Sequence, residues 1–355
     1  MVVDLATFAK FRGFAIALIP AAIGGAFWHW LGLPLGWLMG AAIVTGICSF
    51  NGLKVELPKL LYLPSLAIIG AGVGLTITPS VAAEIARWFP FMAIMGFSGV
   101  LLAALVTPIV ARRGGMKPST AFFALMPGGV IEMANIGEPH GADRTTIAAL
   151  HAIRVALVVG LLPLGLYTFF GSGGAVNIEE TLTWIELAEV LPVALLGGWI
   201  GAKVKMPASW LLGSLLAVGL VTMTGFFGGR IHDPLMAIAQ VIVGMSLGAK
   251  FLRERLASIP RAIAAGTPAL VSIIAVMAAL GIAASFVLPF DIPTMVLAFS
   301  IGGLAEMVLT ARALELNMAI VAAFQAIRAI LVNASAGVIW NKIAPLYGDA
   351  SEEEK

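Results

Sequence analysis

The sequence predicts an all-α membrane protein built from two inverted-topology repeats, each with about five transmembrane helices and one broken, re-entrant helical hairpin. Three observations support this fold class. Hydrophobic residues make up 60% of the 355-residue chain and charged residues only 11%, whereas soluble proteins carry about 25% charged residues. Motifs of the first half return in the second half. A glycine pair interrupts one apolar segment in each half.

The composition places the chain in the lipid bilayer, which is its first expected partner. Its mean hydropathy is +1.02, and apolar runs of transmembrane length recur from one end to the other. The single cysteine, Cys48, excludes an internal disulfide.

The apolar segments are expected to fall into two sets of six. The first repeat, residues 1–170, has segments at about 11–30, 34–50, 57–77, 88–110, 118–137 and 145–170. An external linker rich in glycine occupies residues 171–186. The second repeat, residues 187–345, has segments at about 187–203, 207–226, 234–250, 262–286, 293–311 and 318–340. Residues 346–355 form a charged C-terminal tail.

The duplication is clearest around the glycine pairs. The stretch 127–154 begins PGGVIEM and ends HAIR, and the stretch 301–328 begins IGGLAEM and ends QAIR. Four positions match at an offset of 174 residues: Gly128 with Gly302, Gly129 with Gly303, Glu132 with Glu306, and Arg154 with Arg328. Earlier in each copy, Pro34 and Trp37 match Pro207 and Trp210 at an offset of 173.

The positions of lysine and arginine choose between parallel and inverted copies, because these residues gather on the cytoplasmic side. If all six segments of each copy cross the membrane, 10 basic residues lie inside and 9 outside. If segment five returns to its own side, 16 lie inside and only Arg87, Arg230 and Arg312 lie outside. The sequence therefore predicts inverted copies with both termini in the cytoplasm.

Segment five is the natural hairpin, because Pro127 and the glycine pairs interrupt it in mid-length. A broken backbone at membrane depth is tolerated only where protein covers it or where it lines a cavity. Matching breaks in inverted repeats point to a transporter binding site. The expected substrate- or ion-binding residues gather at these breaks: Pro127, Gly128, Gly129, Glu132, Asn135, His151, Arg154, Gly302, Gly303, Glu306, Gln325 and Arg328.

The glutamates and arginines of this set allow several roles. Half-helix N-termini favour anions, so Glu132 and Glu306 either cap these ends or bind a cation or proton. Arg154 and Arg328 could hold a carboxylate-like substrate. In a purely structural alternative, Glu132–Arg154 and Glu306–Arg328 are buried ion pairs. His151 and Gln325 stand one turn before the arginines, and His151 is read first as a packing residue. Asn135 stands one turn after Glu132.

These motifs carry a family resemblance. The early LPLGWLMGA, the unit MPGGVIEM…ALHAIRVALV and its repeat GGLAEM…AFQAIRAILV resemble the AbrB-type duplicated integral membrane proteins, often described as regulators or as "ammonia monooxygenase". The resemblance covers nearly the whole chain and implies a multi-pass protein of the bacterial-type inner (plasma) membrane. The second copy has Ile301 in place of Pro127. The hairpin also has an architectural likeness to sodium–citrate symporters with elevator mechanisms.

We expect a secondary transporter of a small solute, an anion such as a small carboxylate, coupled to H⁺ or Na⁺ by alternating access. The alternative is a non-transporting membrane sensor or regulator that acts through a partner protein. We expect no enzyme, cofactor or metal site, because the four histidines are scattered and no catalytic dyad can be assembled. The dispersed basic residues do not favour nucleic acid. A homo-oligomer is left open.

The topology can be tested by cysteine labelling in intact cells after Cys48→Ala. A membrane-impermeant thiol reagent should label a cysteine placed within residues 171–184, because the 16-to-3 distribution of basic residues puts this linker outside. Cysteines at either terminus should react only after the cells are lysed. A protected linker cysteine would contradict the inverted arrangement.

Overall fold

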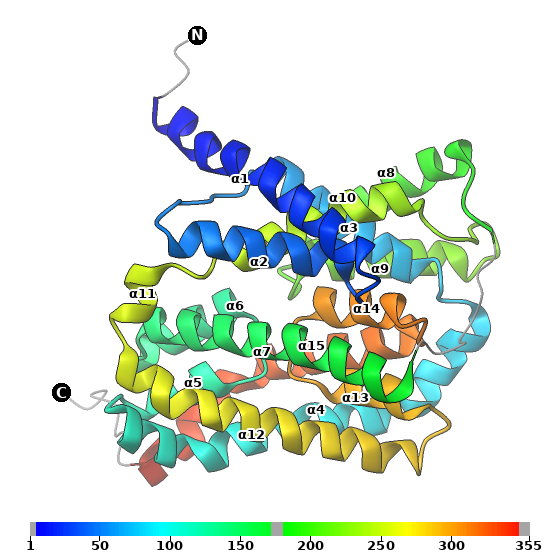
Figure 1. Ribbon diagram of the computed structural model, residues 1–355. Coiled ribbons are helices and arrows are strands. Elements are labelled where there is room, and N and C mark those ends of the chain that lie inside the picture. The colour runs from blue at the N-terminus through cyan, green and yellow to red at the C-terminus, as the bar shows by residue number, and fades with distance from the viewer. Residues whose placement is uncertain (1–4, 172–179, 348–355) are drawn as a thin grey trace. The chain divides into compact units, whose positions relative to one another are not determined.

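The computed structural model describes residues 5–171 and 180–347, which fold almost entirely into helices (Figure 1). The helices of the first half are α1 (Leu5–Trp30), α2 (Gly36–Phe50), α3 (Lys59–Gly74), α4 (Pro79–Gly114), α5 (Pro118–Leu125), α6 (Val130–Gly137), η1 (Glu138–His140) and α7 (Arg144–Phe170). Those of the second half are α8 (Trp184–Lys203), α9 (Ser209–Thr222), α10 (Asp233–Gly248), α11 (Arg253–Ala257), α12 (Pro260–Ser285), α13 (Ile292–Phe299), α14 (Leu304–Ala313), α15 (Met318–Ile343) and η2 (Ala344–Tyr347).

The protein is an all-α membrane protein, as the sequence predicts. Within the described residues, six helices are long and apolar enough to span a membrane: α1, α4, α7, α8, α12 and α15 with η2. Helices α2, α3, α9 and α10 are apolar but shorter. Each of the twelve expected apolar segments overlaps one of these helices, except the fifth of each copy, which overlaps two shorter helices.

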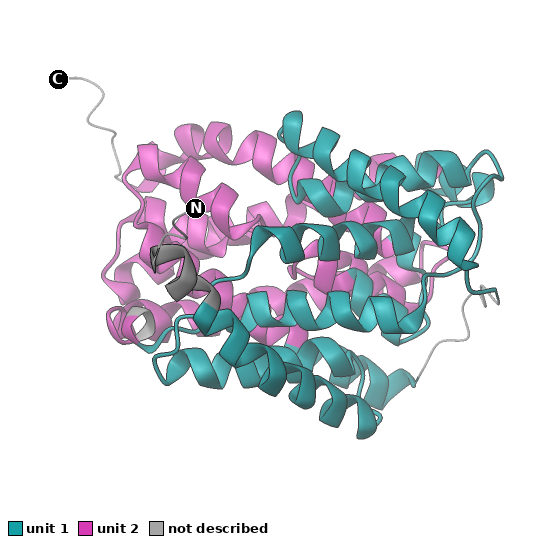
Figure 2. Cartoon of the chain, turned by 90° about the horizontal axis from the view of Figure 1, so that it is seen from above, with its two compact units in different colours: residues 1–86, 160–253, 308–320 teal, residues 87–159, 254–307, 321–355 magenta. Residues whose placement is uncertain are grey.

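The chain divides into two compact units, coloured separately in Figure 2. Unit 1 comprises residues 1–86, 160–253 and 308–320, and unit 2 comprises 87–159, 254–307 and 321–355. Each unit draws on both sequence repeats. Helices α4 and α7 run from one unit into the other without a break, and contain Pro90 and Pro163 respectively. The predicted boundaries of the repeats, at residues 170 and 187, differ from the boundaries of these units and stay a prediction. Residues 172–179 of the linker and 348–355 of the tail lie outside the described residues.

Unit 1 is held together by helices that approach through glycines, in contacts that exchange between the repeats. A Cβ at Gly70 of α3 would collide with the carbonyl oxygen of Leu211 in α9. At the matching place, a Cβ at Gly244 of α10 would collide with the carbonyl oxygen of Leu38 in α2. Such close backbone contact needs small residues. The pairs α3–α9 and α2–α10 are therefore counterparts with the repeats exchanged.

Both breaks lie in unit 2, and the predicted interruptions are confirmed. Helix α5 ends at Leu125 and α6 begins at Val130, while α13 ends at Phe299 and α14 begins at Leu304. Helices α5 and α13 coincide at an offset of 174, and α6 and α14 begin at the same offset. The membrane depth of these breaks stays a prediction.

The helices after the breaks also begin alike. Asp143 Oδ2 accepts a hydrogen bond of 2.7 Å from Thr146 N at the start of α7, and Asn317 Oδ1 accepts one of 3.1 Å from Ile320 N at the start of α15. Burial acts to raise the pKa of the Asp143 carboxyl, but hydrogen bonds from Thr146 and Thr145 outweigh it and the pKa is lowered.

Replacing the charged cap should therefore give a pH-dependent loss of stability. Asp143→Ala should destabilise the purified protein by about 1 kcal/mol at neutral pH, because α7 loses its N-cap. The lowered pKa means that the charged cap stabilises above the unfolded pKa of about 3.9, and that this contribution disappears as the pH falls through the folded value.

Thermal unfolding between neutral and acidic pH measures both effects. Asp143→Asn, which copies the neutral cap of α15, should keep the bond and remove this pH dependence. Asn317→Ala should lower the free energy of unfolding by the same amount at every pH. An Asp143→Asn profile that falls in acid as steeply as the parent would contradict the assignment.

Candidate functional site

At the first break, a buried arginine binds the end of a helix. Arg154 Nη1 donates to Met126 O at 2.5 Å, and Nη2 donates to Gly128 O at 2.9 Å. The side chain projects from α7 and is only 2% exposed. The last carbonyls of a helix have no partner inside it and carry a partial negative charge. The guanidinium group thus caps the C-terminal end of α5 and the break beyond it.

The second break repeats this arrangement. Arg328 of α15 donates through Nη1 to Ser300 O and through Nη2 to Gly302 O, the latter at 2.9 Å. The acceptors lie 174 residues after Met126 and Gly128, the same offset that separates the two arginines. The two breaks are therefore equivalent in their hydrogen bonds as well as in their sequence.

The residues one turn before the arginines complete each cap. His151 Nε2 lies 3.0 Å from Phe123 O and must donate to it, because a carbonyl only accepts. Gln325 Nε2 donates to Leu297 O at 2.8 Å, again at an offset of 174. Gln325 Oε1 also accepts from Arg328 Nη2 at 2.6 Å. His151 is thus a packing and capping residue, as the first reading of the sequence had it.

The hydrogen bonds of the Arg154 and Arg328 guanidinium groups described above run to carbonyl oxygens at the C-terminal end of the helix before each break. Each glutamate lies in the first turn after the break. The ion pairs within each repeat stay a prediction. Across the repeats, Glu306 interacts electrostatically with Arg154, and the two arginines interact with each other. Charges from both breaks therefore lie near one another in unit 2.

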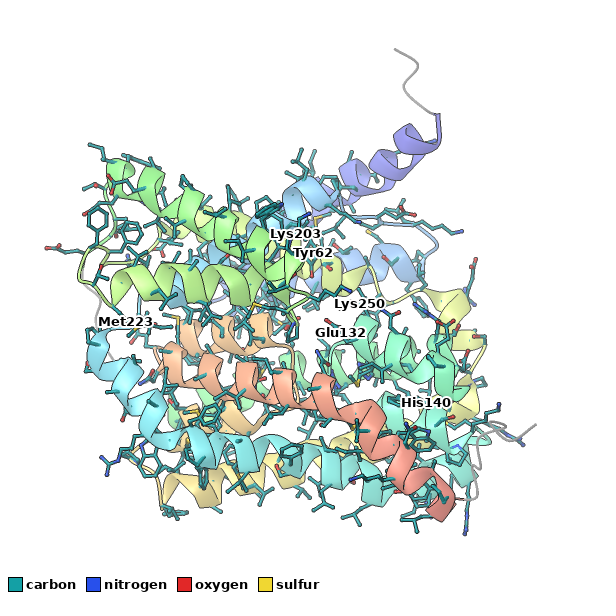
Figure 3. All side chains as sticks on the ribbon, turned by 180° about the vertical axis from the view of Figure 1, so that it is seen from behind. Tyr62, Glu132, His140, Lys203, Met223 and Lys250 are labelled. Carbon is teal, nitrogen blue, oxygen red and sulfur yellow. The ribbon has the colours of Figure 1, made fainter. Side chains whose placement is uncertain are left out.

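The glutamates fold back over the helix starts. A Cβ at Gly129 would collide with the carboxylate of Glu132, and a Cβ at Gly303 would collide with that of Glu306. Figure 3 labels Glu132, whose side chain is partly exposed on α6, whereas Glu306 is 8% exposed. The sequence alternative in which each glutamate lies at its own helix N-terminus agrees with this geometry.

The first N–H groups of α6 and α14 have no carbonyl partner within their own helices. The first backbone bond of α6 runs from Met133 N to Gly129 O at 2.9 Å, and that of α14 from Met307 N to Gly303 O at 3.1 Å. The N–H groups of the preceding residues have no carbonyl within their own helix. Each break therefore offers a partly positive helix end beside a carboxylate.

A side chain at the first glycine of each pair would meet a packed methionine. A Cβ at Gly128 would come 2.7 Å from Met133 Cε, and one at Gly302 would come 2.8 Å from Met307 Cε. Neither glycine has a positive φ. The neighbour at each position is the methionine packed over the break. Pro127 packs similarly against Gly99 of α4: a Cβ added at Gly99 would lie 3.0 Å from Pro127 Cγ.

Asn135 lies apart from this site. Its Oδ1 accepts from Arg144 Nη2 at 3.0 Å, and Arg144 also pairs with Glu138 at 2.5 Å. All three side chains are exposed. The structure therefore brings the other expected residues to the breaks and leaves Asn135 in a surface network.

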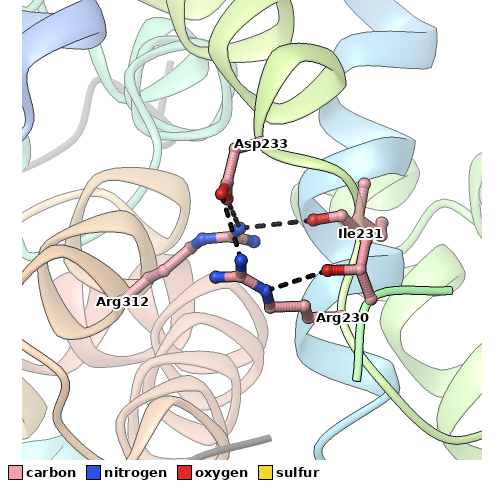
Figure 4. A network of polar contacts seen from close by, with 5 residues as sticks. Arg230, Ile231, Asp233 and Arg312 are labelled. Atoms are coloured by element: carbon pink, nitrogen blue, oxygen red, sulfur yellow. Dashed lines mark hydrogen bonds and ion pairs between the residues drawn. The ribbon is translucent and has the colours of Figure 1, made fainter. Parts of the chain in front are cut away.

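Sequence reasoning missed two features. Ser300, at the second break, donates from Oγ to Leu297 O at 2.9 Å and stands where the first copy has Met126. The second feature is a charged cluster in unit 1, formed by Arg230, Asp233 and Arg312 (Figure 4). It lines a cavity of about 1580 Å³ within unit 1. The sequence analysis used these arginines only as topology markers, although charges beside apolar segments are themselves a signal.

No group of three or more His, Cys, Asp or Glu side chains in the described part of the chain could hold a metal ion.

Comparison with known proteins identifies the family. A family model described as "Transition state regulatory protein AbrB" matches residues 37–344. The chain belongs to the AbrB family. It is 28% identical over 369 residues to "Uncharacterized protein YhjN" of Bacillus subtilis (strain 168), covering 94% of each chain. It is 24% identical over 301 residues to "Putative regulator AbrB" of Escherichia coli (strain K12), covering 83% of this chain and 86% of the relative. The protein is thus a multi-pass helical membrane protein of the AbrB family.

Removing one arginine cap should destabilise the protein. Arg154→Gln leaves the carbonyls of Met126 and Gly128 without charged donors, and hydrogen bonds to charged groups contribute about 1.5–3 kcal/mol each. We expect a lower protein level in the membrane and a lower unfolding temperature in detergent.

The matched control is His151→Gln, which copies the residue found at the same place in the second repeat. It should keep the bond to Phe123 O and leave the unfolding temperature nearly unchanged. Equal losses in both variants would contradict the capping role of Arg154.

Proposed function

We propose that this AbrB-family protein is a secondary transporter that moves a small anionic solute, such as a small carboxylate, across the bacterial inner membrane by alternating access. The observation that carries the proposal is the pair of equivalent helix breaks in unit 2. At each break, a buried arginine binds the end of one short helix, and the next short helix begins with N–H groups that have no carbonyl partner within that helix. Interrupted helices at matching positions of two repeats are typical of transporter binding sites.

The division of charge supports an anionic solute. The guanidinium groups of Arg154 and Arg328 are already occupied by carbonyls, so they position the breaks rather than grip a carboxylate directly. The helix starts at Val130 and Leu304 supply the partial positive charge that favours an anion. A solute carboxylate would displace the carboxylates of Glu132 and Glu306 from these ends, or accept hydrogen bonds beside them.

The same carboxylates suit coupling to a cation. Glu132 is partly exposed at its break and can exchange a proton or Na⁺ with water, whereas Glu306 is buried. A carboxylate that is neutralised by H⁺ or Na⁺ no longer competes with an anionic solute for the helix end. Cation and anion binding at the break would then favour each other, which is the requirement for symport.

The second candidate is a membrane sensor or regulator that acts through a partner protein. It is favoured by the name of the Escherichia coli relative and by the description of the family model. Net flux of solute distinguishes the two candidates, because a sensor binds its ligand without carrying it across the membrane.

Flux in proteoliposomes tests the proposal. A panel of small carboxylates should enter vesicles under an inward H⁺ or Na⁺ gradient, and one gradient should drive uptake. Glu132→Gln should abolish that dependence and lower gradient-driven uptake at least about tenfold, which corresponds to a loss of about 1.4 kcal/mol. The matched control is Glu189→Gln, at an exposed position of α8, and should transport normally. Specific binding without flux under either gradient would favour the sensor.

A further inference from the structure

The charged cluster of unit 1 lies in a cavity with a largely apolar wall. Arg230, Asp233 and Arg312 all line the cavity of about 1580 Å³, together with apolar side chains such as Phe227 and Met236. Pockets for small organic ligands commonly measure about 300–1,000 Å³ and combine an apolar wall with a few polar groups. The cavity therefore has room for such a ligand and the kind of lining that one requires.

Each arginine of the cluster makes a single contact with the shared carboxylate (Figure 4). Arg312 Nη2 donates to Asp233 Oδ1 at 2.9 Å and lies 3.4 Å from Ile231 O. Arg230 Nη2 lies 3.2 Å from Asp233 Oδ2, and Arg230 Nε donates to Thr181 Oγ1 at 3.3 Å. Within the described residues, Nη1 of neither arginine makes a hydrogen bond. Each guanidinium fork therefore has a donor left for a second acceptor.

The cluster has an excess of positive charge. Two guanidinium groups meet at one carboxylate, and the two arginines repel each other electrostatically. Arg312 is the more enclosed of them, with 19% of its side chain exposed, so solvent screens this repulsion less than at an open surface. The other titratable residues of the lining are His29, Tyr167 and Glu315. Glu315 is exposed and, among the described contacts, forms no ion pair with either arginine. A second carboxylate between the arginines would neutralise the cluster.

The backbone holds Arg230 in a fixed position. Arg230 N donates to Glu180 O at 2.9 Å, and Leu182 N donates to Arg230 O at 3.0 Å, beside a short parallel bridge. The preceding Gly229 has a φ of 107°, and a Cβ there would lie 2.8 Å from Glu180 O. Asp233 is fixed as well, because it occupies the first position of α10, where the helix N-terminus stabilises a carboxylate. Fixed binding groups lower the entropic cost of holding a ligand.

The predicted topology gives an independent argument for a role in binding. Lysine and arginine gather on the cytoplasmic side, and only Arg87, Arg230 and Arg312 are expected outside. Two of these three meet at one carboxylate in the cavity. Positive charge on the external side works against the expected orientation, so a requirement for it in the cavity accounts for both arginines.

We propose that the cavity of unit 1 binds a small organic carboxylate, whose oxygens accept hydrogen bonds from Arg230 and Arg312 while its apolar part packs against the lining. Asp233 stays between the two arginines and keeps them in place. All lining residues belong to unit 1, so this site is separate from the helix breaks of unit 2. In the predicted topology the ligand arrives from outside the cell. The inference goes beyond the proposed transport and requires no flux.

Protection of a cysteine next to Arg312 tests the proposal in the purified, full-length protein. In the Cys48→Ala background, Ala313→Cys places a thiol at an exposed position of the cavity lining. Acetate, succinate and benzoate are the probes, and at least one of them should slow the reaction of this thiol with a maleimide in a saturable manner. Chloride keeps the ionic strength constant, so that general screening of charge does not contribute.

Two variants of the same ion pair separate binding from stability. Arg230→Gln removes a charged donor to the ligand and should raise the half-protecting concentration at least about tenfold. Asp233→Asn removes the competing acceptor and should lower that concentration. A purely structural role predicts shifts in the same direction, because both variants break the contact between Arg230 and Asp233. The matched control is Arg87→Gln, an exposed arginine also expected outside, which should change nothing.

Opposite shifts in Arg230→Gln and Asp233→Asn would support the carboxylate site. Failure of all three carboxylates to protect the thiol, or shifts in the same direction, would overturn it. Inorganic phosphate or sulfate that protects at lower concentrations than all three probes would overturn the organic ligand. The thiol reaction involves no transport, so a negative flux assay has no bearing on these outcomes.

Discussion

The arrangement of unit 2 depends on two buried guanidinium groups that bind the ends of broken helices. A helix that stops inside an apolar region leaves carbonyls that neither lipid nor its own backbone can satisfy. Arg154 and Arg328 each satisfy two of them, and His151 and Gln325 bind the carbonyls one turn earlier. The high cost of placing an arginine in the membrane is offset because each break supplies the acceptors that the arginine needs. The glycines, methionines and glutamates after the breaks can then pack as they do.

The equivalence of the two breaks is one of hydrogen bonds rather than of residue types. Histidine in one repeat is glutamine in the other, and Met126 corresponds to Ser300, yet the donors and the carbonyls coincide in position. Pro127 is replaced by Ile301 without loss of the interruption. The need to satisfy the carbonyls at each break therefore constrains the path of the backbone and the position of the arginine. The other side chains at the breaks can differ between the repeats. Asn135 and Leu309 are an example of that divergence.

Much of the fold could be predicted from the sequence, because its apolar runs and repeated motifs are strong signals. Long apolar runs, the glycine pairs and the constant offset located the helices, both interruptions and the residues that gather at them. The partners of the charges were beyond it. Spacing alone put Glu132 and Arg154 on neighbouring segments, and their opposite charges suggested a pair, but nothing in the sequence indicated that Arg154 also binds the preceding helix end. Every residue has a backbone carbonyl, so the sequence does not indicate which carbonyls a guanidinium group will bind. That becomes known only from the folded structure. The interleaved compact units were also hidden, because they depend on contacts between segments that are distant in the chain.

Two of the helices that continue from one unit into the other, α4 and α7, are locally weakened near the crossing. Unit 1 gives way to unit 2 after Ala86 in α4, and unit 2 gives way to unit 1 after Val159 in α7. Pro90 and Pro163 stand four residues beyond these boundaries. A proline cannot donate to the carbonyl four residues before it, so the carbonyls of Ala86 and Val159 lose their helical bond. Each of these helices is thus softened at the place where it leaves one unit, which favours a bend there.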